Sequence, residues 1–481
     1  MISVRLVGHE NFYGVGDVLR VFGATISEDR EESIVCGKLG IGDDIEIVSV
    51  YEDGKARTSV VNRDIEILGD EYSANLDSKR ETKRQLYLAL SRLLGKELPW
   101  GSLTGIRPTL VARQCGFDSK LLQEKFFVRQ DKARLAVETS LVETRILEKV
   151  SKDKLNVYVG VPFCPSRCAY CSFIAMDAVK HLDKLPAYAD ALCKEISEIG
   201  SAIRESGKQI GTIYFGGGTP TVFDEENFAK VMGAIKTHLV ANSEDELEFT
   251  VEAGRPDTIT LAKLQAMKLS GVKRICINPQ TMCDETLARY NRKHTVADVV
   301  KVFELARSLG FEINMDLIAG LNEDRPEELL ESIDKLCNLK PENITIHTIY
   351  KKRRAALSRA EVLGDGADEL DGVLSKAYEH LAKFGYAPYY LYRQKDTRLS
   401  LENVSFSLEK HECKYNVAMM SDERDVLAIG AGAMSKRCFD EGRVERCPCI
   451  KDAIGYITNV DEMIKKKIVF FELGGENAKE N

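Results

Sequence analysis

Three cysteines give this chain its most reactive motif: Cys164, Cys168 and Cys171, spaced C-x3-C-x2-C. Three thiolates at this spacing can hold three irons of a [4Fe–4S] cluster and leave the fourth iron open. A coordination position that the protein does not fill can bind and activate a ligand, as in catalytic metal sites. The alternatives are a chance grouping of cysteines and a zinc site without its fourth ligand. The spacing favours the catalytic cluster.

The elements that must position these cysteines begin near residue 155, where apolar, β-branched runs alternate with helical patterns. Strands are expected at 157–161, 212–215, 247–251, 274–277, 313–318 and 344–349, and helices at about 185–205, 224–240, 258–270, 284–308 and 326–339. This alternation predicts parallel strands joined by right-handed crossovers. Six units are fewer than the eight of a closed barrel, so the predicted fold is α/β, an open or partial (βα)6 barrel. Its chemistry is expected at the carboxyl ends of the strands.

A glycine run follows the second expected strand, as Gly216-Gly217-Gly218-Thr219-Pro220. Glycines allow a positive φ and let backbone groups approach a ligand closely. A phosphate-binding loop is a weaker interpretation, because no Lys-Ser/Thr follows. A plain tight turn is the other alternative.

Polar residues also follow the third, fourth and fifth expected strands. Glu252 ends an apolar run and therefore needs a partner, either a ligand's hydroxyl or ammonium group or a salt bridge to Arg255 or Arg274. Gln280 supplies an amide, Arg292 a cation and Asp316 a carboxylate. Each is weak alone, but their shared position at strand ends favours a common site.

The flanking segments indicate smaller α+β regions. Residues 1–150 carry a hairpin pattern around Asp53-Gly54 and helical patterns at 78–95 and 119–150. Residues 351–481 combine a helix at 367–384, a strand at 388–392 and a helix near 451–467. We expect an accessory domain over 1–150, the barrel over 151–350 and a substrate-covering domain over 351–481.

Bulk properties narrow the function class. The chain has 481 residues, 44% of them hydrophobic, and a net charge of −8 that disfavours nonspecific nucleic-acid binding. No apolar run approaches the roughly 20 residues of a membrane span, and no signal peptide is evident. Thirteen scattered cysteines suit a reducing cytoplasm, where we expect the protein to act.

Several motifs resemble those of radical S-adenosylmethionine (SAM) enzymes, and specifically of the oxygen-independent coproporphyrinogen III oxidase family. They are Tyr-x5-Cys-x3-Cys-x2-Cys, Gly-Gly-Gly-Thr-Pro-Thr, Val-Glu-Ala-Gly-Arg-Pro-Asp, Asn-Pro-Gln-Thr-Met and Asn-Met-Asp-Leu-Ile. Leu-Thr-Gly-Ile-Arg-Pro, Tyr-Arg-Gln-Lys and Leu-Glu-Asn-Val resemble the HemZ-type coproporphyrinogen dehydrogenase branch. The likeness covers essentially the whole chain and is most specific over residues 155–320.

The resemblance implies a [4Fe–4S] cluster on Cys164, Cys168 and Cys171. It implies SAM contacts from Tyr158, Tyr170, Gly217, Gly218, Thr219, Glu252, Gln280, Arg292 and Asp316. It also implies a second SAM molecule. The contacts would then be divided between the two SAM molecules. No catalytic side chain is expected beyond the cluster and SAM.

The same resemblance implies a reaction. A 5′-deoxyadenosyl radical from SAM removes a propionate β-hydrogen of coproporphyrinogen III, and CO2 and one electron then leave. Two rounds give the two vinyl groups of protoporphyrinogen IX. The partners are therefore this tetrapyrrole and an unidentified one-electron donor. Candidate cations for the propionates are Lys351, Lys352, Arg353, Arg354, Arg393 and Lys395.

Other functions stay open. The family contains members that resemble haem chaperones, and haem-opening methyltransferases and tRNA-modifying enzymes share the radical chemistry. The chain departs from its relatives at 320–324, at Ser405-Phe406 and at Gly160, positions outside the cluster motif that bear on the substrate. A second cluster on Cys413, Cys438, Cys447 and Cys449 lacks the paired spacing of a metal site.

Overall fold

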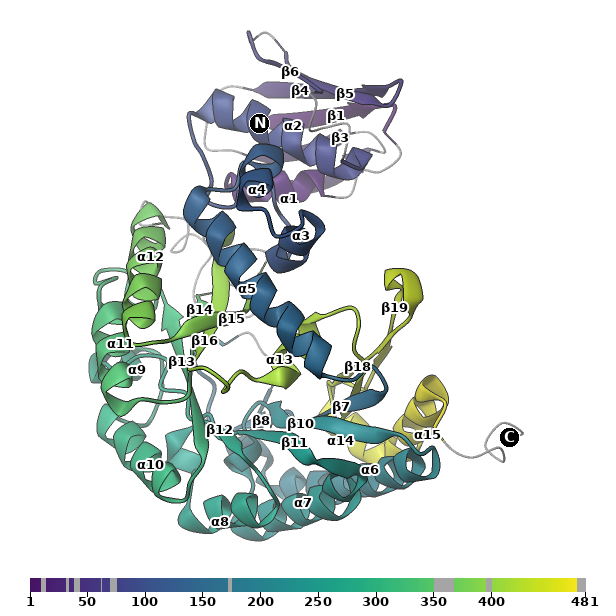
Figure 1. Cartoon of the computed structure of the whole chain (residues 1–481), viewed down its shortest axis with the longest axis vertical. Helices are drawn as coiled ribbons and strands as arrows, with labels where there is room; N and C mark the ends of the chain where they lie inside the picture. Colours follow the sequence, from purple (N-terminus) through teal and green to yellow (C-terminus); the bar gives the residue numbers. More distant parts are fainter. Residues whose placement is uncertain are drawn as a thin grey trace.

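The computed structural model describes residues 1–9, 14–31, 34–38, 44–61, 63–69, 76–171, 175–349, 367–394 and 400–473. The chain forms a small N-terminal sheet, a helical connection and a large curved sheet with helices on its outer side (Figure 1). Within this described part, every helix is too short or too polar to span a lipid bilayer.

The N-terminal sheet has the strand order β2-β3-β1-β4-β5-β6. Its strands are β1 (Ile2–Val7), β2 (Thr25–Glu31), β3 (Ile34–Lys38), β4 (Ile45–Glu52), β5 (Lys55–Val60) and β6 (Glu66–Leu68). Two helices, α1 (Val15–Val21) and α2 (Ser78–Leu94), share an apolar core with it. The predicted hairpin is confirmed, because β4 and β5 pair antiparallel across a turn in which Asp53 and Gly54 both have a positive φ.

Three helices connect this sheet to the large one: α3 (Pro108–Gln114), α4 (Ser119–Phe126) and α5 (Gln130–Lys149). The helical pattern predicted over 119–150 forms two helices, because α4 ends at its C-cap, Phe127, whose φ is 58°. The long helix α5 runs beside the large sheet (Figure 1). The Lys132 ammonium on α5, 1% exposed, lies 2.6 Å from Glu402 and 2.9 Å from Asp371. The Trp100 indole donates to the same Glu402 at 2.7 Å, so this buried group ties the connection to the sheet.

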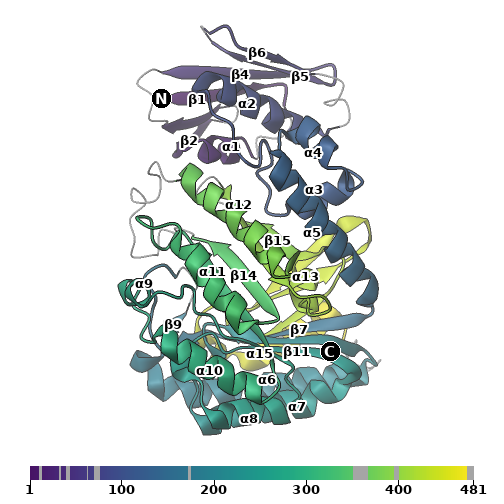
Figure 2. The ribbon, with the colours of Figure 1, turned by 60° about the vertical axis from the view of Figure 1, so that its left-hand side comes forward.

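The six predicted barrel strands are confirmed. They are β7 (Lys154–Val161), β10 (Gln209–Gly217), β11 (Ser243–Glu252), β12 (Arg274–Cys276), β13 (Glu312–Ala319) and β14 (Asn343–Thr348). They lie side by side in chain order and all pair in parallel. The covering helices are α6 (Leu185–Glu205), α7 (Glu225–His238), α8 (Leu261–Leu269), α9 (Asp284–Arg289), α10 (Val296–Ser308) and α11 (Glu328–Leu339). Figure 2 shows them along the outer face, as right-handed crossovers require.

The C-terminal part of the chain extends this same sheet at both edges. Its elements are α12 (Ala367–Lys383), β15 (Ala387–Arg393), β16 (Glu402–Ser407), α13 (Lys414–Met420), β17 (Val426–Ile429), β18 (Met434–Cys438), β19 (Val444–Pro448), α14 (Ala453–Thr458) and α15 (Val460–Phe471). Strand β16 pairs antiparallel with β14, and β17 pairs in parallel with β7 at the opposite edge. The described strands after residue 367 therefore all belong to the barrel sheet. The domain divisions at residues 150 and 350 stay predictions.

Candidate active site

A cavity of about 890 Å³ opens where the parallel strands end. Every residue expected to hold the cluster or SAM lines it: Tyr158, Cys164, Cys168, Tyr170, Cys171, Gly217, Gly218, Thr219, Glu252, Gln280, Arg292 and Asp316. The structure thus brings together residues that are scattered over more than 150 positions of sequence. Their individual roles stay predictions.

The cysteine loop follows β7. Cys164 lies in the short strand β8 (Phe163–Cys164), which pairs with β9 (Met176–Asp177), and the Cys171 N–H closes a turn on the Cys168 carbonyl at 3.1 Å. No disulfide involves any of the thirteen cysteines, all of which the structure describes. Burial raises the pKa of Cys164 to about 11, so this sulfur stays a thiol until a metal displaces its proton.

The cysteine sulfurs do not converge on one point. Among the described residues, no three His, Cys, Asp or Glu side chains gather as they would around a single metal ion. A [4Fe–4S] cube instead takes each cysteine on a different iron, so its ligands stand apart. The described side chains therefore do not form the zinc site that the spacing left open.

Two positions of the glycine run have either no room for a larger residue or a backbone conformation that disfavours one. A Cβ on Gly218 would lie 2.5 Å from the Phe163 carbonyl oxygen and 3.0 Å from Cys164 Sγ. Gly217 has a φ of 116°, and its N–H donates to Glu252 at 2.9 Å. Because that N–H is already bound to a carboxylate, the run does not form the phosphate-binding cradle weighed above. It packs against the cluster loop instead.

Glu252 is held by neutral donors. Tyr214 donates to its Oε1 at 2.7 Å and Gly217 to its Oε2 at 2.9 Å. The salt bridges considered from sequence are absent among the described contacts: Arg255 pairs with Asp257 and Arg274 with Glu248 and Glu312. Burial raises the pKa of Glu252 to about 7, against the opposing effect of these hydrogen bonds. A ligand cation or hydroxyl would favour the carboxylate form.

Arg292 lies in the segment between the helices α9 and α10 and reaches the cavity from there. The continuous helix predicted over 284–308 is wrong: α9 ends at Arg289, and α10 starts after Thr295, whose side chain forms a capping box with Asp298. The intervening segment turns Arg292 inward, where it is 7% exposed and donates to the Tyr170 hydroxyl at 2.9 Å. Its Nη2 donates to the backbone carbonyl oxygens of Gly254 and Asn278. No carboxylate pairs with it in the described part of the chain, so no anion there neutralises its charge.

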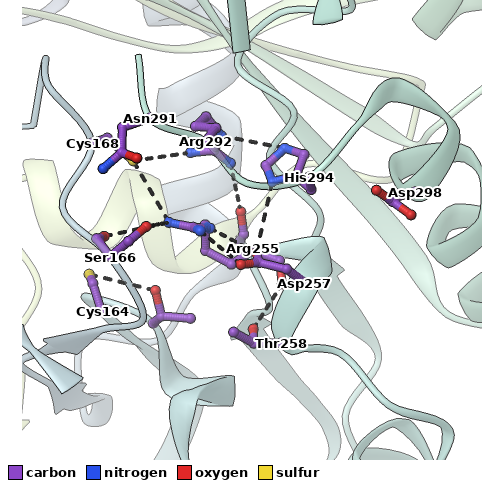
Figure 3. Close-up of polar contacts among 12 residues, drawn as sticks. Cys164, Ser166, Cys168, Arg255, Asp257, Thr258, Asn291, Arg292, His294 and Asp298 are labelled. Carbon is purple, nitrogen blue, oxygen red and sulfur yellow. Dashed lines mark hydrogen bonds and ion pairs between the residues drawn. The ribbon is translucent and has the colours of Figure 1, made fainter. Parts of the chain in front are cut away.

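Arg292 belongs to a polar group around the cluster loop, drawn in Figure 3. Its Nη1 lies 3.8 Å from Cys168 Sγ and its Nε donates to His294 Nε2 at 3.4 Å. Burial lowers the pKa of His294, so the imidazole is neutral and can accept this hydrogen bond. The second ring nitrogen lies 3.8 Å from Asp257, which in turn binds Arg255.

Gln280 and Asp316 face each other across neighbouring strand ends. The Gln280 backbone, with a φ of 72°, donates to the Asp316 carbonyl oxygen at 2.9 Å. The Asp316 carboxylate accepts from Asn314 at 2.7 Å and lies 3.6 Å from His347 Nε2. Tyr392 lies 3.2 Å from the other nitrogen of His347. A carboxylate, an imidazole and a phenol thus form a chain along this wall.

Two buried amide oxygens test whether SAM fits the cavity. Asn278 Oδ1 and Gln280 Oε1 have no hydrogen-bond partner among the described residues, although both residues line the cavity. Buried acceptors of this kind require donors. SAM carries an ammonium group, an adenine amine and ribose hydroxyls, so the donor set of the ligand suits the wall.

Beside the predicted Tyr158, further tyrosines that the sequence analysis missed form one side of the cavity. The Tyr214 and Tyr415 rings stack with centroids 4.6 Å apart, and the centroid of the Tyr158 ring lies 6.3 Å from that of Tyr214. Strand β15 adds Tyr389, Tyr390 and Tyr392 to the lining. Tyr158 and Tyr214 are direct partners in the pairing of β7 and β10, so polar residues alternating within apolar strands were the available signal. Nothing local in sequence identifies Tyr415.

The expected propionate-binding cations are not confirmed. Arg393 is 3% exposed, lies over the Trp100 ring at 5.1 Å and donates to the Ser400 carbonyl oxygen at 2.7 Å. Arg393 therefore packs on the segment that connects the N-terminal sheet to the large sheet and does not line the cavity. Residues 351–354 and Lys395 lie outside the described residues.

The other four cysteines do not share a site with one another. Cys413 lines the active-site cavity and donates to Glu248 at 3.4 Å, whereas Cys438 lines a different cavity. Cys447 and Cys449 are buried near the edge of the large sheet that β18 and β19 form. The four cysteines thus lie in different surroundings, so the second cluster finds no support.

Comparison with known proteins places this fold and site. Residues 158–335 match the model of the Radical SAM superfamily, whose members use a [4Fe–4S] cluster and SAM. The chain is 35% identical over 390 residues to the oxygen-independent coproporphyrinogen-III oxidase-like protein HemZ of Bacillus subtilis, covering 78% of this chain and 77% of that protein. The protein therefore belongs to the oxygen-independent coproporphyrinogen-III oxidase-like family.

Two further similarities frame that assignment. The heme chaperone HemW of Bacillus subtilis is 34% identical over 287 residues, which cover 58% of this chain and 70% of HemW. The coproporphyrinogen III oxidase HemN of Escherichia coli, a radical SAM enzyme, aligns with a TM-score of 0.51 at 19% identity over 68% of this chain and 73% of its own. At that identity the likeness shows the shared fold alone.

Proposed function

We propose that this protein oxidatively decarboxylates two propionates of coproporphyrinogen III and releases protoporphyrinogen IX. The observation that carries the proposal is the single cavity in which the cluster loop, the SAM residues and a tyrosine-rich wall meet. Its volume of about 890 Å³ falls within the range of pockets that enclose organic ligands. The similarity to HemZ supports the choice of a coproporphyrinogen as substrate.

When bound, the cluster and SAM supply the radical that starts the reaction. The chain's own residues bind and orient the reactants and keep water away from them. Arg292 is poised for a carboxylate, and Glu252 for an ammonium or hydroxyl group. The stacked rings of Tyr158, Tyr214 and Tyr415 offer a flat, mostly apolar surface that suits a pyrrole ring.

Polar groups of the same wall suit the propionates. Tyr390, Tyr392, Asn403 and Asn416 line the cavity and carry neutral hydrogen-bond donors. A one-electron donor must reduce the cluster and is the second partner of this proposal. The scattered cysteines and an oxygen-sensitive cluster support a cytoplasmic location for the reaction.

The test is anaerobic turnover of the reconstituted protein with SAM, a reductant and coproporphyrinogen III, followed by mass spectrometry. We expect the substrate to lose two carboxyl groups as CO2 while 5′-deoxyadenosine accumulates. SAM cleavage with an unchanged tetrapyrrole mass would contradict the proposal. A product with an added methyl group would instead identify a methyltransferase.

A haem chaperone is the second candidate, because HemW is similar over much of the barrel. His347 lines the cavity and presents an imidazole, a common axial ligand of haem iron. Stoichiometric haem binding that His347→Ala abolishes, without any coproporphyrinogen turnover by the parent protein, would favour this function. Turnover of coproporphyrinogen III in the assay above would instead favour the oxidase over the chaperone.

A further inference from the structure

Arg255 ties the end of the third barrel strand to the middle of the cluster loop. Its guanidinium is buried, with the residue 4% exposed. Nη1 donates to Ser166 Oγ at 3.1 Å and lies 3.9 Å from Cys168 Sγ (Figure 3). Ser166 stands between two cluster cysteines in sequence. One side chain thus contacts both the loop backbone and a ligand sulfur.

Asp257 fixes the orientation of this guanidinium. Nε and Nη2 of Arg255 donate to the two carboxylate oxygens at 2.9 and 2.8 Å, a bidentate arrangement. Burial alone would raise the pKa of Asp257, but hydrogen bonding to His294 and Arg255 outweighs it and holds the pKa well below the ordinary value. The remaining nitrogen of Arg255 is therefore kept facing the loop.

Cys168 receives positive charge from two directions. Arg292 Nη1 lies 3.8 Å from the same sulfur, whereas Cys164 Sγ accepts from the neutral Thr219 hydroxyl at 3.6 Å. Hydrogen bonds to ligand sulfurs and local charge are among the factors that set the potential of an iron–sulfur cluster. A cation beside a thiolate favours the state with one more electron.

We propose that Arg255 is a positioning residue that also sets the reduction potential of the cluster, acting through Cys168. Arg292 pairs with no carboxylate in the described part of the chain, whereas Arg255 is paired with Asp257 and bound to Ser166, so the position of Arg255 does not depend on a ligand. The inference depends on the cluster site and not on coproporphyrinogen as substrate. Failure of either proposal leaves the other intact.

The experiment compares three variants after anaerobic reconstitution, without SAM or substrate. Arg255→Gln removes the charge and the bidentate pair. Asp257→Asn keeps Arg255 but removes the anion that offsets its charge. Arg289→Gln, an exposed arginine at the end of α9, is the matched control. Iron and sulfide per chain are measured first, and the midpoint potential then follows from a redox titration monitored by electron paramagnetic resonance.

We expect the midpoint potential to become more negative in Arg255→Gln, more positive in Asp257→Asn and to stay unchanged in Arg289→Gln. A purely structural role would lower the cluster content of both variants and shift their potentials in the same direction. A parental potential in Arg255→Gln, or shifts of equal sign in both variants, overturns the proposal. If Arg255→Gln holds no cluster, Asp257→Asn decides alone, and a potential that does not rise overturns the proposal.

Discussion

Tyr214 donates its hydroxyl hydrogen to Glu252 over 2.7 Å, from one barrel strand to the next. The pair is partly buried, so the phenol stabilises a carboxylate that burial otherwise disfavours. The protonation state of Glu252, with a pKa of about 7, is thereby balanced near neutral pH. Several expectations depend on this balance and on the packing around it.

Replacing Tyr214 by Phe should make SAM binding more dependent on pH. Without the hydrogen bond, the pKa of Glu252 rises further, so the carboxylate forms only at higher pH. Calorimetric titration of SAM from about pH 6 to about pH 9 should show weaker binding near neutrality and recovery at the alkaline end. Tyr415→Phe is the control, since Tyr415 stacks on Tyr214 but its hydroxyl does not bind Glu252 in the described contacts. Equal profiles for both variants would contradict the assignment.

Glu252→Gln should stabilise the ligand-free protein at alkaline pH. A folded-state pKa near 7 against 4.5 for the free side chain costs about 3 kcal/mol once Glu252 is ionised in both states. The sign follows from the raised pKa: stability is present below the unfolded value and is lost as the pH rises through the folded one.

Thermal unfolding near about pH 8 and about pH 5 tests this expectation. The melting temperature of Glu252→Gln should exceed that of the parent at the higher pH and approach it at the lower. Glu246→Gln, an exposed carboxylate of the same strand, should change neither. A variant that is less stable at both pH values would rule out the burial argument.

Cys168→Ala should prevent cluster assembly, because each cysteine of the loop is needed for one iron. Iron and sulfide content after reconstitution and the production of 5′-deoxyadenosine should both be lost. Cys193→Ala removes a thiol on α6, away from the cavity lining, and should keep both. Retained turnover in Cys168→Ala would refute the cluster site itself.

Gly218→Ala should damage the cluster loop without unfolding the chain. The added methyl group meets the Phe163 carbonyl oxygen at 2.5 Å, an overpacking contact that costs about 1–3 kcal/mol. Gly233→Ala lies on the open face of α7, where the new Cβ meets nothing within 4 Å, and should stabilise by about 0.5–1 kcal/mol. Denaturant unfolding and iron content separate the two, and similar values for both would disprove the contact.

Lys132→Met should destabilise the protein by about 3–5 kcal/mol, because it leaves the buried Glu402 without its salt-bridge partner and Asp371 with Arg129 alone. Arg134→Met, on the same helix but exposed, should change stability little. Denaturant midpoints of the two variants provide the measurement. A small effect of the first would mean that water reaches the pair.

The barrel and its loop were predictable because their signals are local. The six strands each contain buried apolar residues, and the cluster cysteines lie within eight residues of one another. Burial on both faces leaves a nearly continuous apolar pattern that few other structures produce. Gly217, Glu252 and Asp316 then followed from the rule that strand ends meet at one edge.

The remaining features depend on contacts between distant segments. The sequence around Thr295 is compatible with a capping box, but the apolar periodicity on both sides of it favoured one helix. Arg393 has the composition of a ligand-binding cation, and only the packed Trp100 ring shows that it is structural. Tyr415 joins Tyr214 from a helix that no pattern links to the barrel.

The parallel pairing of β17 with β7 has a consequence for biosynthesis. The first barrel strand emerges early from the ribosome, yet its outer edge has no partner until residues 426–429 have been translated. Until then β7 presents unpaired backbone groups, a template for misassociation between nascent chains. A premature stop before Val426 would leave every cluster residue in place but expose that edge permanently. Such truncated chains should depend on chaperones or be degraded.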